Sequence, residues 1–130
     1  MWERFQPNPA GRNVGDCAVR AIAKALETDW DTAYARLVLA GFHYKDLPSA
    51  NSVWGAVLRQ HGFAREAIPN TCPDCYTAAE FAAEHPRGTF VLVFSEGTVG
   101  HVATVKDGNL YDSFDSSDCV PQYYFYRKDE

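Results

Sequence analysis

The sequence has no long apolar run, no basic stripe and no low-complexity segment. No stretch approaches the ~20 apolar residues that span a bilayer, and residues 1–13, MWERFQPNPAGRN, lack the apolar core of a signal peptide. These absences predict a cytoplasmic protein without a membrane partner. The 12 Lys and Arg residues are scattered and the formal net charge is −5, so no surface for nucleic-acid phosphates is expected.

What remains is the composition of a globular domain, with 46% hydrophobic and 14% aromatic residues. A chain of 130 residues can bury a core without the help of metal or disulfides, so we predict one domain over residues 1–130. In the cytoplasm its four cysteines are expected to stay reduced.

Helix signals dominate the first two thirds of the chain. Apolar residues after Asp16 recur every three or four positions and predict a helix over 17–26. Further helices are predicted over 28–41, 53–61 and 77–85. The predicted N-terminal caps are Asp16, Thr28 with Asp31, Ser52, and Thr77 with Glu80, and the predicted stops are Gly41, Gly62 and Pro86.

After Gly88 the pattern changes to short runs rich in β-branched and aromatic residues. They predict antiparallel strands over 89–95, 100–105, 109–114 and 122–127, the last as an edge strand, and residues 63–70 predict at most one more short strand. The predicted class is α+β, with N-terminal helices packed on a C-terminal antiparallel sheet.

One hairpin register can be read from the sequence. Asp107 and Gly108 form a favoured two-residue turn, which sets Lys106 opposite Asn109. Stepping away from the turn puts His101 and Asp112 on the same face, as diagonal neighbours ~7 Å apart at the backbone. An imidazole and a carboxylate can therefore meet there.

A cysteine stands at the predicted start of the first helix. A first helical turn has unpaired N–H groups and a positive dipole end, which with a nearby imidazolium bring a thiol pKa from ~8.5 to between ~3.5 and 7.5. The backbone N–H of Cys17 is also placed to stabilise an oxyanion. Cys17, His101 and Asp112 are thus the candidate nucleophile, base and orienting group for cysteine catalysis.

This order, with a cysteine opening an N-terminal helix, a histidine in GHVATV and an aspartate in LYDSF, resembles that of the papain-like cysteine peptidases. The resemblance implies a papain-like fold and a peptidase, isopeptidase or amidase that forms an acyl-enzyme on a peptide or protein substrate, without a cofactor. The segments NPAGRNVGDCAVRAIAKAL and HPRGTFVLVFSEGTVGHVATVKDGNLYDSFDSSD are also similar to small proteins encoded by phages and prophages.

The chain departs from the papain pattern before the nucleophile. The family places Gln six residues before its cysteine to complete the oxyanion hole, and this chain has Gly11 there. Gln6, Asn8 and Asn13 are the nearby amides that could supply the second donor, and the sequence does not choose among them.

Two other classes of function compete with the hydrolase. The first is an inactive papain-like fold that acts as a protein-binding module. The second is a zinc or redox protein centred on Cys72 and Cys75 in TCPDCYT, with Cys119 and a histidine as further ligands, although the same pair could simply form a disulfide. The remaining histidines, His43, His61 and His85, lie at predicted helix ends, and the acidic loop DSFDSSD lacks the spacing of a calcium loop, so no metal is expected.

Overall fold

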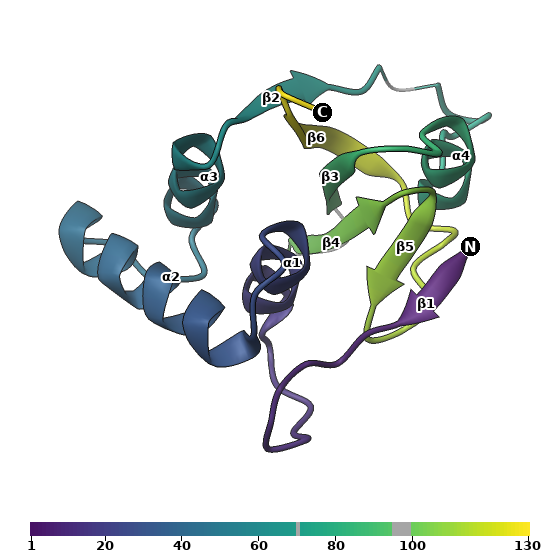
Figure 1. The fold of residues 1–130 in the computed structure, drawn as a ribbon. Coiled ribbons are helices and arrows are strands. Elements are labelled where there is room, and N and C mark those ends of the chain that lie inside the picture. Colours follow the sequence, from purple (N-terminus) through teal and green to yellow (C-terminus); the bar gives the residue numbers. More distant parts are fainter. Residues whose placement is uncertain (70, 95–99) are drawn as a thin grey trace.

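A six-stranded mixed sheet forms the centre of the fold, and helices cover both of its faces (Figure 1). The computed structural model describes residues 1–69, 71–94 and 100–130. In chain order the elements are β1 (Trp2–Arg4), α1 (Cys17–Ala25), α2 (Trp30–Tyr44), α3 (Asn51–Gln60), β2 (Phe63–Ala67), α4 (Ala78–Glu84), β3 (Thr89–Phe94), β4 (His101–Lys106), β5 (Asn109–Asp112) and β6 (Pro121–Arg127). The predicted α+β class is confirmed.

The strand order is β1-β5-β4-β3-β6-β2. Asp107 and Gly108 both have positive φ, 49° and 82°, as the two-residue turn between β4 and β5 requires. Lys106 stands opposite Asn109 and Val105 opposite Leu110, so the predicted register is confirmed. The start of β4 and the end of β5 therefore meet at one end of the sheet.

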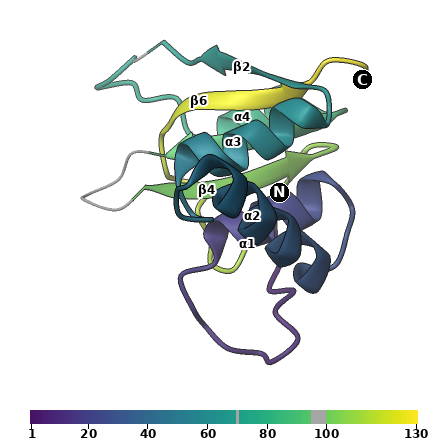
Figure 2. The same ribbon diagram turned by 90° about the vertical axis from the view of Figure 1, so that its left-hand side faces the viewer.

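Helices α1 and α3 pack on one face of the sheet, α2 lies outside them, and α4 covers part of the other face (Figure 2). The core on the α1 side includes Ile22, Trp54 and Phe125, and a second cluster around Phe81 lies beneath α4. The buried hydroxyl of Thr104 on β4 donates a hydrogen bond to the Ala21 carbonyl of α1, at 2.8 Å. This bond helps to fix α1 over β4, and with it the position of the first residue of the helix.

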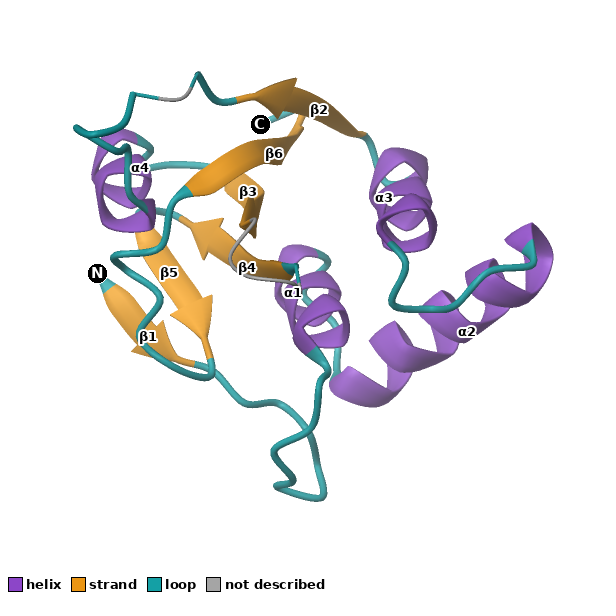
Figure 3. Ribbon diagram, turned by 180° about the vertical axis from the view of Figure 1, so that it is seen from behind, coloured by secondary structure: helices purple, strands orange, loops and turns teal. Residues whose placement is uncertain are grey.

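Two sheet predictions are wrong. Strand β1 was not predicted, and it pairs in parallel with β5, so the sheet is mixed rather than wholly antiparallel (Figure 3). Strand β6 lies between β3 and β2 rather than at an edge, because residues 63–67 do form a strand that pairs with it. Ser95 and Asn70, at the ends of predicted strands, lie outside the described residues.

The starts of α1 and α4 agree with the sequence prediction, whereas those of α2 and α3 differ. Thr77 and Glu80 form the predicted capping box of α4. Helix α2 is capped by Asp29, whose side chain accepts a hydrogen bond from the Thr32 N–H at 2.7 Å, rather than by Thr28. Helix α3 begins one residue before Ser52, and its N-cap is Ala50.

Helix α2 also continues through Gly41 to Tyr44 instead of stopping at the glycine. A Cβ on Gly41 would come within 2.7 Å of the Asp46 carbonyl oxygen, so this glycine permits a close approach of the chain that follows the helix. Gly62, by contrast, ends α3 with a φ of 86°, as predicted. None of the helices in the described ranges is long and apolar enough to cross a membrane.

Candidate active site

Cys17 is the first residue of α1, and its half-buried side chain meets the start of β4. The sulfur hydrogen-bonds with the side chain of His101 and with the backbone N–H of Val102. At the first helical position the N–H of Cys17 itself has no partner within the helix. The thiol therefore lies among hydrogen-bond donors at the positive end of a helix.

His101 is the first residue of β4 and is held on several sides. Its Nε2 lies 2.6 Å from Oδ2 of Asp112, which leaves Nδ1 as the ring nitrogen available to the thiol. The ring stacks on Phe94, with ring centres 5.7 Å apart, and contacts Phe114 at 5.0 Å. Hydrogen bond and packing together fix the orientation of the imidazole.

The Asp112 carboxylate is fully buried at the end of β5, and each of its oxygens is engaged. Oδ2 accepts from His101 and from the Ser116 hydroxyl at 2.7 Å. Oδ1 accepts from the backbone N–H of Ser113 at 2.8 Å and from the Arg20 guanidinium at 3.5 Å. Because every donor comes from a fixed part of the structure, Asp112 has little freedom to turn away from His101.

A buried arginine connects the start of α1 to this carboxylate. Arg20 is only 5% exposed and bonds to both Asp16 and Asp112. Asp16 also accepts a hydrogen bond from Trp30 Nε1 at 2.9 Å. Asp16 is the N-cap residue of α1, as predicted, but its side chain makes no cap hydrogen bond, because its buried carboxylate is bonded to Arg20 and Trp30 instead.

The contacts between Cys17 and His101 shift both pKa values. Burial alone raises the pKa of Cys17, but hydrogen bonds from His101 and the Val102 N–H, with the charges of His101 and Arg20, outweigh it and lower the pKa below its ordinary value. Burial alone lowers the pKa of His101, but hydrogen bonds with Asp112 and Cys17 outweigh it and raise the pKa to about 9. Both shifts favour a thiolate beside an imidazolium.

Among the described residues, none of the three candidate donors for the oxyanion forms a hydrogen bond with Cys17. Gln6 accepts a hydrogen bond from the Asn8 N–H at 3.3 Å, and Asn8 accepts one from the Ala10 N–H at 2.9 Å. Asn13 is exposed. Asn8 lines a cavity of about 570 Å³ between the N-terminal segment and α2. The second oxyanion donor stays a prediction.

Cys72 and Cys75 form a disulfide, which differs from the expectation that all four cysteines are reduced. In this form neither sulfur can bind zinc as a thiolate. The described residues contain no group of three or more His, Cys, Asp or Glu side chains that could hold a metal ion. His61 and His85 each place Nδ1 near the backbone carbonyl four residues earlier, at 2.8 and 2.7 Å, as expected of histidines at helix ends.

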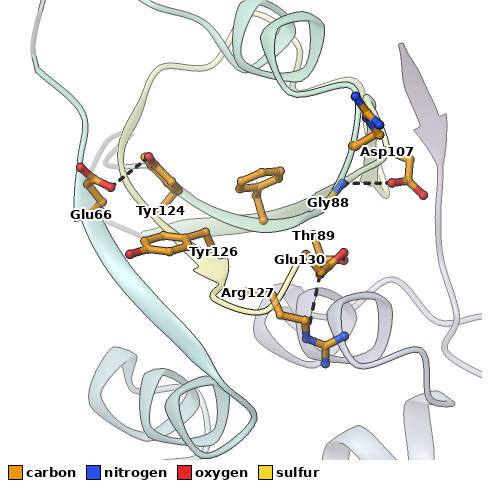
Figure 4. Close-up of a pocket in the computed structure, with 10 residues that line it drawn as sticks. Glu66, Gly88, Thr89, Asp107, Tyr124, Tyr126, Arg127 and Glu130 are labelled. Carbon is orange, nitrogen blue, oxygen red and sulfur yellow. Dashed lines mark hydrogen bonds and ion pairs between the residues drawn. The ribbon is translucent and has the colours of Figure 1, made fainter.

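A separate concavity of about 740 Å³ lies at the opposite end of β3 and β4 (Figure 4). Its lining includes Tyr124, Tyr126 and Glu66, and the Tyr124 hydroxyl donates to the Glu66 carboxylate at 3.4 Å. Gly88 and Asp107, which line the concavity, adjoin the paired residues Thr89 and Lys106 at one end of β3 and β4. His101 pairs with Phe94 at the other end of the same two strands, so the concavity is far from the thiol. It shares no residue with the Cys17 site.

Sequence reasoning identified the three residues that the structure brings together, but missed Arg20 and Ser116. A signal for Arg20 was present, because it lies one turn after Cys17 on a helix otherwise rich in alanine. Ser116 carries no such signal, since it sits in the acidic loop DSFDSSD, where serine is an ordinary turn residue. Comparisons of the chain with protein-family models, with curated proteins and with solved structures each find no match.

Proposed function

We propose that the protein is a papain-like cysteine hydrolase that cleaves amide or thioester bonds through an acyl-enzyme. The observation that carries the proposal is the continuous hydrogen-bonded series from Cys17 through His101 to Asp112, at the start of a helix. A lowered thiol pKa beside a raised imidazole pKa is the electrostatic state in which cysteine is nucleophilic near neutral pH.

The proposed reaction has two halves. The Cys17 thiolate attacks the substrate carbonyl carbon and forms a C–S bond, while the oxyanion faces the Cys17 N–H. The imidazolium of His101 gives its proton to the leaving nitrogen or sulfur as the scissile bond breaks, which leaves an acyl-enzyme. Neutral His101 then takes a proton from water, the water oxygen attacks the acyl carbon, and the C–S bond breaks to restore the thiolate and imidazolium.

In this proposal Asp112, Arg20 and Ser116 are positioning residues. Asp112 holds the imidazole with Nδ1 toward the thiol. Arg20 and Ser116 hold Asp112 in turn, and Arg20 also adds positive charge that favours the thiolate. The arrangement explains why a full positive charge is buried so close to the nucleophile.

The class of substrate follows from the resemblance rather than from a bound ligand. The order of Cys17, His101 and Asp112 in the chain is similar to that of papain-like peptidases, which supports a peptide, isopeptide or other protein-derived amide as the substrate. Similarity to phage- and prophage-encoded proteins supports a phage origin, and we place the activity in the cytoplasm.

A protein-binding module is the second candidate, and one observation favours it. Large apolar side chains are exposed on and just after α2, with Leu39 at 69%, Phe42 at 74% and Leu47 at 68%. Isolated exposed apolar residues are ordinary, but several on neighbouring turns are typical of interaction surfaces. This candidate needs no reactive thiol, which separates it from the hydrolase.

Alkylation of Cys17 by iodoacetamide from pH 4 to 9, measured by peptide mass spectrometry, tests the hydrolase. We expect Cys17 to label rapidly well below pH 7, and His101→Ala to slow labelling at pH 6 by about tenfold or more, because each unit of pKa lost changes the thiolate fraction tenfold. The control variant is His43→Ala, on the exposed end of α2, and Cys119 serves as the internal comparison.

The proposal fails if Cys17 labels with an ordinary thiol profile that His101→Ala leaves unchanged. If the thiol is reactive, fluorogenic peptide and isopeptide substrates are the next measurement. Turnover that disappears in Cys17→Ala then establishes the hydrolase, and a reactive thiol without turnover of any acyl substrate contradicts it.

A further inference from the structure

A small groove of about 270 Å³ runs between α3 and the adjoining strands β2 and β6. One wall is a stripe along α3 that begins at Asn51 and Ser52 and ends at Arg59. The opposite wall is formed by Arg65 of β2 with Tyr123 and Phe125 of β6. None of these residues belongs to the Cys17 site.

Two arginines from different elements face this groove, and neither has an acidic partner among the described residues. Among the described residues no carboxylate side chain lines the groove, and neither Arg59 nor Arg65 forms an ion pair. Glu66 follows Arg65 in β2 but lies on the other face of the sheet, where it accepts from the Tyr124 hydroxyl. In a chain of net charge −5, two like charges gathered without a counter-charge favour an anionic ligand.

Both guanidinium groups are held over aromatic rings. Arg65 lies 3.9 Å from the ring centre of Tyr123, and Arg59 lies 5.6 Å from that of Phe125. Tyr123 and Phe125 are two residues apart on β6, so their rings lie on the same face of the sheet. Stacking occupies the face of a guanidinium and leaves its N–H edge able to bind a carboxylate or phosphate through two hydrogen bonds.

The start of α3 adds donors to the same groove. Its N-cap, Ala50, provides no side-chain cap, and the first turn contains no acidic residue. The Asn51 amide is anchored to the Tyr123 hydroxyl at 3.2 Å. Asp46 is the one carboxylate bonded to a groove residue among those described, and it already accepts from the Ser52 hydroxyl and from the Leu47 N–H.

We propose that this groove binds an oxyanion, either a carboxylate or a phosphate group, between Arg59 and Arg65. The anion relieves the repulsion between the two cations and accepts from their free N–H edges. The site is separate from the proposed hydrolase chemistry and does not depend on it.

Titration with inorganic phosphate and, separately, with glutarate tests the site at constant ionic strength set with chloride. The readout is the backbone amide shifts of Ser52 and Val53 by NMR. We expect a saturable shift with at least one of the two anions, and the stronger of them identifies the preferred oxyanion. Arg59→Gln and Arg65→Gln should each weaken binding by about tenfold or more, because each removes a charged hydrogen-bond donor.

The matched control is Arg87→Gln, which removes an exposed arginine before β3, outside the groove, and should leave the titration unchanged. All three arginines are exposed, so the variants should fold, and their Cys17 alkylation should match wild type. Absence of a saturable shift with both anions, or equal binding by the Arg59→Gln/Arg65→Gln double variant, overturns the proposal. Because alkylation is followed separately, failure of this site is distinct from failure of the hydrolase.

Discussion

Replacing Arg20 with methionine is the sharpest test of the network beneath the site. Arg20 is 5% exposed and bridges two carboxylates, Asp16 and Asp112, that are 6% and 1% exposed. Methionine fills much of the same space but removes the positive charge and the N–H groups. Both carboxylates then stay buried without their arginine.

The two carboxylates differ in what they retain. Asp112 keeps His101, Ser116 and the Ser113 N–H, whereas Asp16, within the described part of the chain, keeps only the Trp30 indole N–H. Most of the cost should therefore arise at Asp16. Removing one partner of a buried ion pair typically costs about 3–5 kcal/mol. Against a total stability of about 5–15 kcal/mol, Arg20→Met should remove a third or more of the stability of an average domain.

Urea unfolding followed by circular dichroism at pH 7 measures this loss. Arg87→Met, at an exposed position before β3, is the control and should change stability by less than about 0.5 kcal/mol. The double variant Arg20→Met/Asp16→Asn should recover part of the loss, because it removes the carboxylate left without a cation. A loss below about 1 kcal/mol for Arg20→Met would refute the reasoning.

If Arg20→Met does not fold, Arg20→Lys is the second variant to test. Lysine keeps the positive charge but cannot make the planar hydrogen bonds with which a guanidinium bonds to two carboxylates. In this variant Asp112 should be held less firmly and the alkylation profile of Cys17 should move to higher pH. An unchanged profile in a folded variant would mean that Arg20 has a structural role only.

Two further predictions concern stability. Thr77→Ala removes the hydroxyl of the capping box of α4 and should cost about 1 kcal/mol in urea unfolding, while Thr71→Ala, in the exposed loop before the helix, should cost less. In Cys17→Ala, the hydrogen bond with Asp112 still raises the pKa of His101, but no thiolate titrates beside it. A protonated His101 then stabilises the fold fully below pH ~6.5, the pKa of an unfolded histidine, and this stabilisation should be lost as pH rises through the raised pKa. Wild type should vary less over this range, because the folded pair and the unfolded pair then each bind about one proton; equal pH dependence in the two proteins would contradict the coupling.

Local sequence signals predicted the features that depend on a few neighbouring residues. The Asp107-Gly108 turn predicted the register of β4 and β5, because positive φ at both positions leaves few ways to pair the strands. The Thr77 and Glu80 capping box predicted the start of α4, because the two side chains bond to backbone N–H groups within the same turn. These signals were sufficient to bring His101 and Asp112 together.

Features that depend on distant partners were not predictable in this way. Strand β1 has only three residues, and its pairing is provided by β5 more than 100 positions later. Asp16 has the residue type and place of a helix cap, but burial beside Arg20 and Trp30 determines its contacts instead. Gly41 carries the signal of a helix stop, although its role is to admit the backbone of Asp46.

The parallel pairing of β1 with β5 also bears on when the thiol can become reactive during synthesis. Residues 2–4 pair with residues 110–112, and Cys17 meets His101 only once β4 has formed. A growing chain thus carries Cys17 from an early stage, yet His101 and Asp112 emerge from the ribosome 84 and 95 residues later. Until then Cys17 has the reactivity of an ordinary cysteine, so the nascent chain does not carry an activated thiolate that could attack neighbouring polypeptides.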